Sequence, residues 1–344
     1  MPESMNRWGI EMNRPVRTCM PCVALASSML MIYASPASAE YDFELVSPPG
    51  SVFTQAFGIN NAGKVVGGAD DGSAPFSFIY DMKTGEYTTI GTEFNALEIS
   101  NSGVIVGDSG DFCAIRDTKG DITLFSPPSY TTGSFCQARG VNSKGKVSGF
   151  EVDAAGVWLG FVYDSQQGTF EEFLPSNQTI AHGINAQSQI AGSVFLEADD
   201  AFPGSAAGRY GFVREADGSV KYFAISQSLP GQTTGRGISE SGLVAGFYLD
   251  ADTFEFKSYV TTVSDGTAFE EITLTDDEVV YQSPCDPNLP APPGPGYALL
   301  FTDFTASQVR NDGVVVGSCA DIYFDETTGD FVAYTNGFVA TPAK

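Results

Sequence analysis

The stretch GINNAGKVVGG at residues 58–68 decides the fold, because near-copies of it recur along the chain. The copies begin near residues 58, 98, 140, 183, 237 and 308. Each has an aliphatic residue in second place and a glycine near its end. Polar residues followed by glycine between two short apolar runs are typical of a β-hairpin turn, since glycine readily adopts positive φ. The repetition predicts a series of similar structural units.

Two further strands are expected in most units. Segments such as PFSFIYD (75–81) follow the hairpin, and segments such as EYTTI (86–90) follow after another turn. Four short antiparallel strands in about 40 residues are the pattern of a β-propeller blade. The last copy lacks a fourth strand, and YDFELVSPP (41–49) resembles the outer strand of the second copy. We therefore expect an all-β fold, a six-bladed β-propeller of four-stranded antiparallel blades, closed by the N-terminal strand of the mature chain.

The N-terminal segment has the pattern of a cleaved signal peptide. Arg14 and Arg17 precede an apolar run, which ends in the small residues Ala37-Ser38-Ala39. We predict a signal peptide at 1–39, cut after Ala39, and a single six-repeat domain at 40–344 with an insertion at 275–305. The apolar run is short for a membrane span. The mature protein is expected to be secreted or periplasmic, monomeric and without a membrane span.

The charge balance excludes several classes of function. The chain has 344 residues, 42 Asp and Glu against 17 Lys and Arg, and a formal net charge of −25. Binding to a nucleic-acid backbone needs clustered basic residues, so no nucleic-acid partner is expected. The chain has one histidine, His182, which excludes sites built on several histidines. No nucleophile elbow, zinc-protease motif or P-loop occurs.

The repeat resembles a known family. The pattern GINxxGxVVG, followed by a strand such as GFVYD (160–164), is similar to the HAF-type extracellular repeats of bacterial secreted proteins. The similarity covers nearly all of the mature chain, although the His-Ala-Phe triplet itself is absent. The resemblance implies export and a repeat architecture, and it carries no reaction that could be assigned to particular residues.

All variation in loop length falls at one end of the predicted units, which we call the loop face. It comprises the connections between second and third strands, notably 193–209, 247–256 and 318–336, and those between blades, notably 126–137 and 275–305. Variable loops on a rigid scaffold commonly bind partners. The opposite end, the turn face, carries the tight first–second and third–fourth turns.

Four mature cysteines map to the loop face, and four cysteines allow three pairings. Proximity in the predicted blades favours disulfides Cys113–Cys136 and Cys285–Cys319. Each bridge contributes about 2–4 kcal/mol. A four-thiolate metal site is the alternative, but these four cysteines include no CxxC pair, since Cys19 and Cys22 belong to the predicted signal peptide.

Acidic residues also gather in the second–third loops. Calcium binds such oxygen-rich loops, so calcium is a possible cofactor and none is required. The alternative is surface charge that keeps the protein soluble. The candidate ligands are Asp70, Asp71, Asp199, Asp200, Asp250 and Asp252.

One position of the repeat carries basic residues although the chain as a whole is acidic. Immediately before its first motif residue, the third, fourth and fifth copies carry Arg139, His182 and Arg236. Equivalent positions in adjacent blades are neighbours near the central channel, so these groups are expected to lie together. They are candidates for a site that binds an anion such as a uronate, because Arg binds carboxylates in a bidentate manner. The alternative is a structural role with channel carbonyls or water.

Two classes of function remain. The first is a non-catalytic binding or scaffold module that recognises an extracellular glycan, surface polymer or protein through the loop face. The second is a carbohydrate-active enzyme, either a polysaccharide lyase or a glycoside hydrolase, at the mouth of the channel. His182 is a candidate catalytic base in that case, with Arg139 and Arg236 neutralising a carboxylate. Fold alone does not decide between them.

Overall fold

The computed structural model describes residues 37–173, 176, 178–262, 269–274, 285 and 297–343. Every described strand belongs to the unit Pro36–Lys344. The predicted signal peptide lies outside the described residues except for 37–39. Within the described residues, strands and turns make up the whole structure, with no helix. Accordingly, this part of the chain has no apolar helix long enough to cross a membrane.

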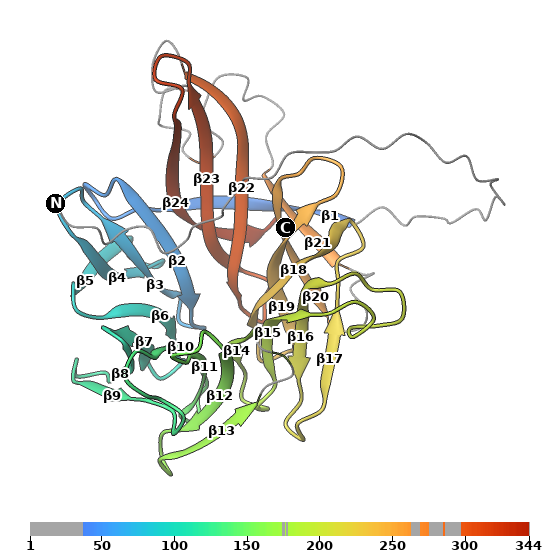
Figure 1. Cartoon of the computed structure of the whole chain (residues 1–344). Coiled ribbons are helices and arrows are strands. Elements are labelled where there is room, and N and C mark those ends of the chain that lie inside the picture. Colours follow the sequence, from blue (N-terminus) through green and yellow to red (C-terminus); the bar gives the residue numbers. More distant parts are fainter. Residues whose placement is uncertain are drawn as a thin grey trace. The chain divides into compact units, whose positions relative to one another are not determined.

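Four-stranded antiparallel sheets in a β-propeller arrangement confirm the predicted fold class (Figure 1). The first three sheets run in chain order as β2-β3-β4-β5, β6-β7-β8-β9 and β10-β11-β12-β13. Their strands are β2 (Phe53–Ile59), β3 (Lys64–Asp70), β4 (Pro75–Asp81), β5 (Glu86–Gly91), β6 (Asn95–Ile99), β7 (Ile105–Ser109), β8 (Phe112–Arg116), β9 (Ile122–Phe125), β10 (Phe135–Val141), β11 (Lys146–Val152), β12 (Trp158–Asp164) and β13 (Thr169–Phe173).

The fourth sheet has twelve strands, so the structure contains four hydrogen-bonded sheets and not the six predicted. Its order is β14-β15-β16-β18-β19-β20-β21-β1-β24-β23-β22, and β17 pairs with β16. Its strands are β1 (Ala37–Val46), β14 (Thr179–Ile184), β15 (Ile190–Leu196), β16 (Gly208–Arg214), β17 (Val220–Phe223), β18 (Ser228–Ile238), β19 (Leu243–Asp250), β20 (Phe256–Thr262), β21 (Phe269–Leu274), β22 (Tyr297–Val309), β23 (Val315–Asp325) and β24 (Phe331–Pro342).

Close backbone contact explains one of the two junctions that merge the units. Strands β16 and β18 join in parallel at Arg209 and Gln232. A Cβ atom added at Gly208 would lie 2.5 Å from the Cα of Gly231, so both glycines are needed for the backbones to come this close. The sequence repeat does not predict this junction, because Gly208 and Gly231 lie outside the repeated motif.

Strand β1 makes the second junction. Its residues Tyr41–Val46 pair antiparallel with β24, with Tyr41 opposite Pro342 and Val46 opposite Gly337. This places the segment at 41–46 beside the last hairpin, as the sequence predicts. Its earlier residues, Ala37–Tyr41, pair in parallel with Glu270–Leu274 of β21. The predicted cut after Ala39 therefore falls within β1.

The predicted loop 318–336 is wrong, because most of it is strand. Strands β23 and β24 extend through it and pair as far as Phe324 and Phe331 (Figure 1). Their short turn is stabilised by Asp325, whose Oδ1 accepts hydrogen bonds from the backbone N of Thr327 and Thr328 at 2.8 and 3.3 Å. Similarly, residues 297–305 of the predicted insertion belong to β22. Residues 275–284 and 286–296 of that insertion lie outside the described residues.

The glycine near the end of each repeat makes room for an aromatic ring in the core. Cβ atoms at Gly67, Gly149 and Gly192 would lie 2.1–2.3 Å from a carbonyl oxygen of the preceding strand. Rings from the third strand lie over most of these glycines. The pairs are Gly67 with Phe78, Gly149 with Phe161, Gly192 with Phe212, Gly246 with Tyr259 and Gly317 with Phe338. Alternating glycine and buried aromatic residues therefore fix the spacing of the second and third strands.

Candidate functional site

Six equivalent positions of the repeat line one cavity on the innermost strands. Besides the predicted Arg139, His182 and Arg236, they include Phe57, Leu97 and Ser307. The cavity volume is about 20 Å³. The structure thus brings together the three residues that sequence reasoning grouped. That volume holds one or two water molecules and is far below what a sugar ring needs.

Aromatic rings hold both arginines in the cavity. The guanidinium carbon of Arg139 lies 5.7 Å from the ring centroid of Phe150, and that of Arg236 lies 5.2 Å from the centroid of Phe247. The two phenylalanines occupy equivalent places in β11 and β19. Such stacking is favourable for cations and orients the guanidinium groups.

His182 is the most buried of the three, with 6% of its surface exposed. Its imidazole has no hydrogen-bond partner among the described residues, although its carbonyl oxygen accepts a hydrogen bond from the Ser148 hydroxyl at 2.6 Å. Burial and the nearby charges of Arg236, Arg139 and Arg209 hold the pKa of His182 well below its usual 6.5. The imidazole is therefore neutral at pH 7.

Burial disfavours the charged form of both arginines. Burial lowers the pKa of Arg139 to about 10, although the Asp108 carboxylate opposes this change. Burial and the charges of Arg139 and Arg209 lower the pKa of Arg236 to about 9. The Nε atoms of Arg139 and Arg236 are shielded from solvent and have no hydrogen-bond partner among the described residues.

Glu98 and Gln308 form a divider beneath this cavity, which sequence reasoning missed. Gln308 Nε2 donates a hydrogen bond to Glu98 Oε2. Each side chain also accepts from the next backbone N–H, Ile99 N at 2.8 Å for Glu98 and Val309 N at 2.9 Å for Gln308. Both residues are buried. Burial raises the pKa of Glu98 to about 8 despite these hydrogen bonds.

The signal for this divider is present in the repeat. Glu98 and Gln308 stand where four other copies have glycine. A Cβ atom at Gly58 would lie 2.6 Å from Glu98 Oε1, and one at Gly237 would lie 2.2 Å from Gln308 Oε1. The neighbouring glycines therefore leave space for the two crossing side chains.

A second cavity, of about 50 Å³, opens on the other side of the divider, at the turn face. Both Glu98 and Gln308 line it, as do residues of the first–second turns, including Asn61, Glu240 and Asn311. The hydrogen-bonded pair of Glu98 and Gln308 thus lines both cavities.

The turn face is tied together by hydrogen bonds between successive units. Asn60 Nδ2 donates to the Ser100 carbonyl at 3.1 Å, Asn142 Nδ2 to the Asn185 carbonyl at 2.9 Å, and Asn185 Nδ2 to the Ser239 carbonyl at 3.2 Å. Ser188, which replaces the turn glycine in the fourth copy, adopts a φ of 64°. The turn geometry is thus kept even where the sequence departs from the pattern.

The loop face carries the exposed phenylalanines of the described chain. Their side chains lie in second–third loops or at the strand ends beside them. They are Phe53, Phe112, Phe195, Phe202, Phe254 and Phe331, and the neighbouring Val52 is also exposed. The exposure of Phe254 and Phe331 reaches 65% and 68%. The exposed Ile122 and Leu124 lie apart from this face, on β9. The six phenylalanines, however, all gather at the loop face.

The two faces also differ in the charge of their side chains. Carboxylates at the loop face are Asp70, Asp71, Asp111, Asp153, Glu197, Asp199, Asp200, Asp252, Glu255, Glu326 and Asp330. Lys257 is the lysine that the described loop face contains, and its Nζ lies 3.3 Å from Asp250 and 3.7 Å from Glu271. Lysines and arginines of the turn face are Lys64, Lys83, Arg116, Lys119, Lys144, Lys146, Arg214, Lys221 and Arg310.

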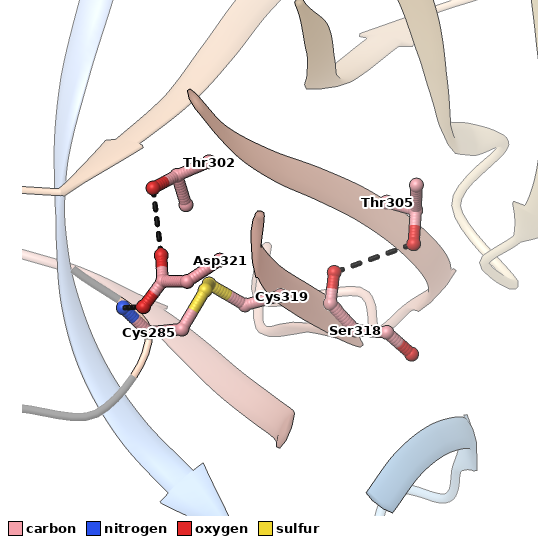
Figure 2. Close-up of a disulfide and its surroundings, with 6 residues drawn as sticks. All are labelled: Cys285, Thr302, Thr305, Ser318, Cys319 and Asp321. Atoms are coloured by element: carbon pink, nitrogen blue, oxygen red, sulfur yellow. Dashed lines mark hydrogen bonds between the residues drawn. A yellow bond between two sulfur atoms is a disulfide. The ribbon is translucent and has the colours of Figure 1, made fainter. Parts of the chain in front are cut away.

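The two predicted disulfides are confirmed. Cys113 and Cys136 join β8 to β10, and Cys285 and Cys319 join a loop-face segment to β23. Figure 2 shows how Asp321 supports the second bridge: its carboxylate accepts from Thr302 Oγ1 at 2.7 Å and from the Cys285 backbone N at 3.2 Å. Disulfides of this kind are typical of proteins in oxidising compartments.

Four of the six predicted calcium ligands are engaged in their own turns. Asp70 Oδ1 accepts from Gly72 N at 2.7 Å, Asp71 Oδ1 from Ser73 N at 2.9 Å and Asp199 Oδ1 from Gly204 N at 2.8 Å. Asp250 bonds the N–H of Asp252. Within the described ranges, no three metal-ligating side chains cluster. A calcium site stays a prediction at these loops.

Comparisons with known proteins add little about function. No protein-family model and no curated protein sequence matches this chain. Among solved structures, an oligogalacturonate lyase in complex with manganese is 10% identical, with 90% of this chain and 99% of the lyase covered and a TM-score of 0.44. A protein of unknown function from Bacteroides thetaiotaomicron is 10% identical, with 89% and 73% covered and a TM-score of 0.46. The β-propeller domain of the trilobed protease from Pyrococcus furiosus is 10% identical, with 82% and 98% covered and a TM-score of 0.42. At these values, the function must be argued from the residues of this chain.

Proposed function

We propose that this protein is a secreted, non-catalytic binding module that docks a basic partner protein on its loop face. One observation carries the proposal: exposed phenylalanines and many carboxylates lie together on the loop face. In the described chain, the carboxylates of this face outnumber its lysines and arginines. Aromatic side chains provide apolar contact area at protein interfaces, and complementary charge speeds encounter and selects the partner.

The balance of charges favours a basic protein over the other candidate partners. Lys257, the described loop-face lysine, is engaged by Asp250 and Glu271, so the surrounding carboxylates are left to attract lysine or arginine on a partner. An acidic polysaccharide would be repelled by the same carboxylates. Neutral glycans would use the phenylalanines but gain nothing from the charge.

The proposed module includes the finer architecture predicted from the repeat. The twelve-stranded sheet holds three repeat units, which together with the three separate sheets make six blades in a ring closed by β1. A shared core supports closure: Val46 and Ala56 near the start of the chain pack in one buried cluster with Val316 and Val339 near its end. Membership of the HAF-type repeat family and a signal peptide cut after Ala39 belong to the same proposal.

The enzyme alternative has weaker support. A neutral His182 could act as a base, but its cavity of about 20 Å³ is too small for a sugar ring. The hydrogen-bonded pair of Glu98 and Gln308 also lines this cavity.

Binding of labelled peptides to the mature chain tests the proposal. Three peptides of equal length are compared, with alternating Lys and Leu, Glu and Leu, or Lys and Gly. We expect the Lys–Leu peptide to bind at least tenfold more tightly than either of the others, because only it offers both charge and apolar contacts.

Two variants with equal net charge show where the peptide binds. The loop-face variant carries Asp71→Asn, Asp200→Asn and Asp252→Asn, and the turn-face variant carries Glu86→Gln, Asp121→Asn and Glu240→Gln. The proposal expects weaker Lys–Leu binding in the loop-face variant alone. Equal weakening in both would mean unspecific charge attraction and would overturn it, as would a panel of neutral glycans or polyuronates binding more tightly than the peptide.

A further inference from the structure

The cavity lined by Arg139, His182 and Arg236 contains two half-buried arginines, and the nearby carboxylates do not balance their charge. The Nε atoms of both arginines are shielded from water and lack a hydrogen-bond partner in the described chain. His182 is more than nine-tenths buried, and its carbonyl oxygen accepts the one hydrogen bond that the described chain gives this residue outside the strand pairing. Buried donors of this kind are rarely left unsatisfied in native proteins.

The carboxylates nearest the cavity are committed elsewhere. Asp108 accepts hydrogen bonds from Asn95 Nδ2 at 2.7 Å and Gln137 Nε2 at 2.6 Å. Of the three cavity residues, Arg139 is the one whose charged form Asp108 favours. Glu98 is hydrogen-bonded to Gln308, and burial disfavours its charged form. Arg209 adds a further positive charge to the same environment. Arg236 in particular has no carboxylate in the described chain that offsets its burial.

A positive charge that is partly withdrawn from water is unfavourable unless a counter-ion pairs with it. The counter-ion must be small, because the cavity volume of about 20 Å³ accepts little more than one water molecule. Donors converge on the cavity from three adjacent repeat units, which suits a spherical anion better than a planar carboxylate attached to a ring. The uronate predicted from sequence is therefore too large for this cavity.

We propose that the cavity binds one compact monovalent inorganic anion, of halide size, between Arg139, His182 and Arg236. This site is separate from the loop-face partner and does not depend on it. The bound anion supplies the missing counter-charge, holds the three repeat units together and accounts for basic residues in the centre of a strongly acidic protein.

Bromide is the test probe, and gluconate is the control anion because it is too large to enter. Unfolding is followed for the whole mature chain at constant ionic strength while bromide replaces gluconate. Stabilisation should rise with bromide and follow a single-site binding curve. A linear rise, or equal stability in both salts, would overturn the proposal.

Variants locate the site. Arg236→Gln should weaken bromide binding by about tenfold or more, since a charge-assisted hydrogen bond is lost. Arg310→Gln is the matched control, because Arg310 lies at the turn face and pairs with Asp312, and it should leave the bromide affinity unchanged. Equal bromide affinity in Arg236→Gln and the wild type would contradict the assignment.

A crystal of the wild-type protein grown in bromide decides the matter independently of any variant that fails to fold. An anomalous peak within hydrogen-bond distance of Arg139, His182 or Arg236 supports the site. A cavity occupied by water alone in saturating bromide overturns it.

Discussion

The two faces of this propeller are built from the same strands but differ in nearly every physical property. At the turn face, short turns repeat with the same geometry and bond to the next unit through Asn60, Asn142 and Asn185. Positive and negative side chains are mixed there. At the loop face, connections vary in length, disulfides replace the repeated hydrogen bonds, and carboxylates surround exposed phenylalanines.

The difference shows how one repeat serves two purposes. Hydrogen bonds between turns depend on identical geometry in every unit, so little variation is tolerated at that end. At the other end the connections differ in length and do not share this geometry, and two of the units are anchored there by a disulfide. Glu98 and Gln308 separate the two ends at the centre.

Breaking the divider should have the largest effect, and the effect should depend on pH. The folded protein raises the pKa of Glu98 from 4.5 to about 8. Below pH 4.5 Glu98 does not reduce the free energy of unfolding, because its carboxyl is protonated in both the folded and the unfolded chain. As the pH rises from 4.5 to 8, the unfolded chain releases its proton first, so stability is lost. Glu98→Gln should remove a loss on the order of 4 kcal/mol.

Urea denaturation at pH 5 and pH 8 measures this effect as the difference in unfolding free energy between Glu98→Gln and the wild type. The difference should grow in favour of the variant towards pH 8. His182 acts in the opposite direction, because its lowered pKa reduces stability as the pH falls below 6.5. A difference that does not change with pH would show that Glu98 is ionised in the folded protein.

Opening a bridge at the loop face should have the next largest effect. Replacement of Cys113 and Cys136 by alanine removes a loop closure and should cost about 3 kcal/mol of unfolding free energy. Chemical denaturation of the two proteins without reductant gives the value. A loss below about 1 kcal/mol would mean that the loop stays closed through packing alone.

At the turn face, Asn185→Ala should cost about 2 kcal/mol. The buried Asn185 side chain accepts from Gln187 N at 3.1 Å and Gln189 N at 2.9 Å, and it donates to Ser239 O at 3.2 Å. Thermal and urea unfolding measure the loss. Asn142→Ala, in the equivalent place one unit earlier, should reproduce it, whereas Asn61→Ala at an exposed turn position should have little effect. Similar losses in Asn61→Ala and Asn185→Ala would refute the idea of a buried network.

The smallest change in stability is expected at the loop-face surface. Phe331 is 68% exposed, so Phe331→Ser should alter the unfolding free energy by less than about 0.5 kcal/mol. Phe338 lies in the same strand and is fully buried, so Phe338→Ser should cost about 3–5 kcal/mol. Comparable destabilisation by both substitutions would mean that Phe331 is part of the core and not of a contact surface.

Much of this architecture could be predicted from the sequence because it depends on local, repeated signals. The hairpin turns depend on polar residues and glycines a few positions apart, and the strands on short apolar runs. When the units are aligned, equivalent positions must be neighbours. This alignment predicts that Arg139, His182 and Arg236 meet, and it selects the correct disulfide pairs.

Other features depend on contacts that no local pattern reveals. Glu98 and Gln308 meet across the centre although they are distant in sequence, and only their shared replacement of glycine links them. The long hairpin of β23 and β24 has the sequence pattern of a loop because it extends beyond the repeated motif. The junction at Gly208 and Gly231 depends on two backbones that approach closely, which a strand pattern does not encode.

Strand β1 has a consequence for the order of assembly. It precedes every other described strand in the chain, yet its antiparallel partner, β24, is the last. Residues 37–41 of β1 can pair with β21 as soon as that strand is made, but residues 41–46 have no strand partner until β24 follows. Until then their backbone N–H and C=O groups form an open edge that can pair with another chain, so the pairing with β24 protects the protein against edge-to-edge association.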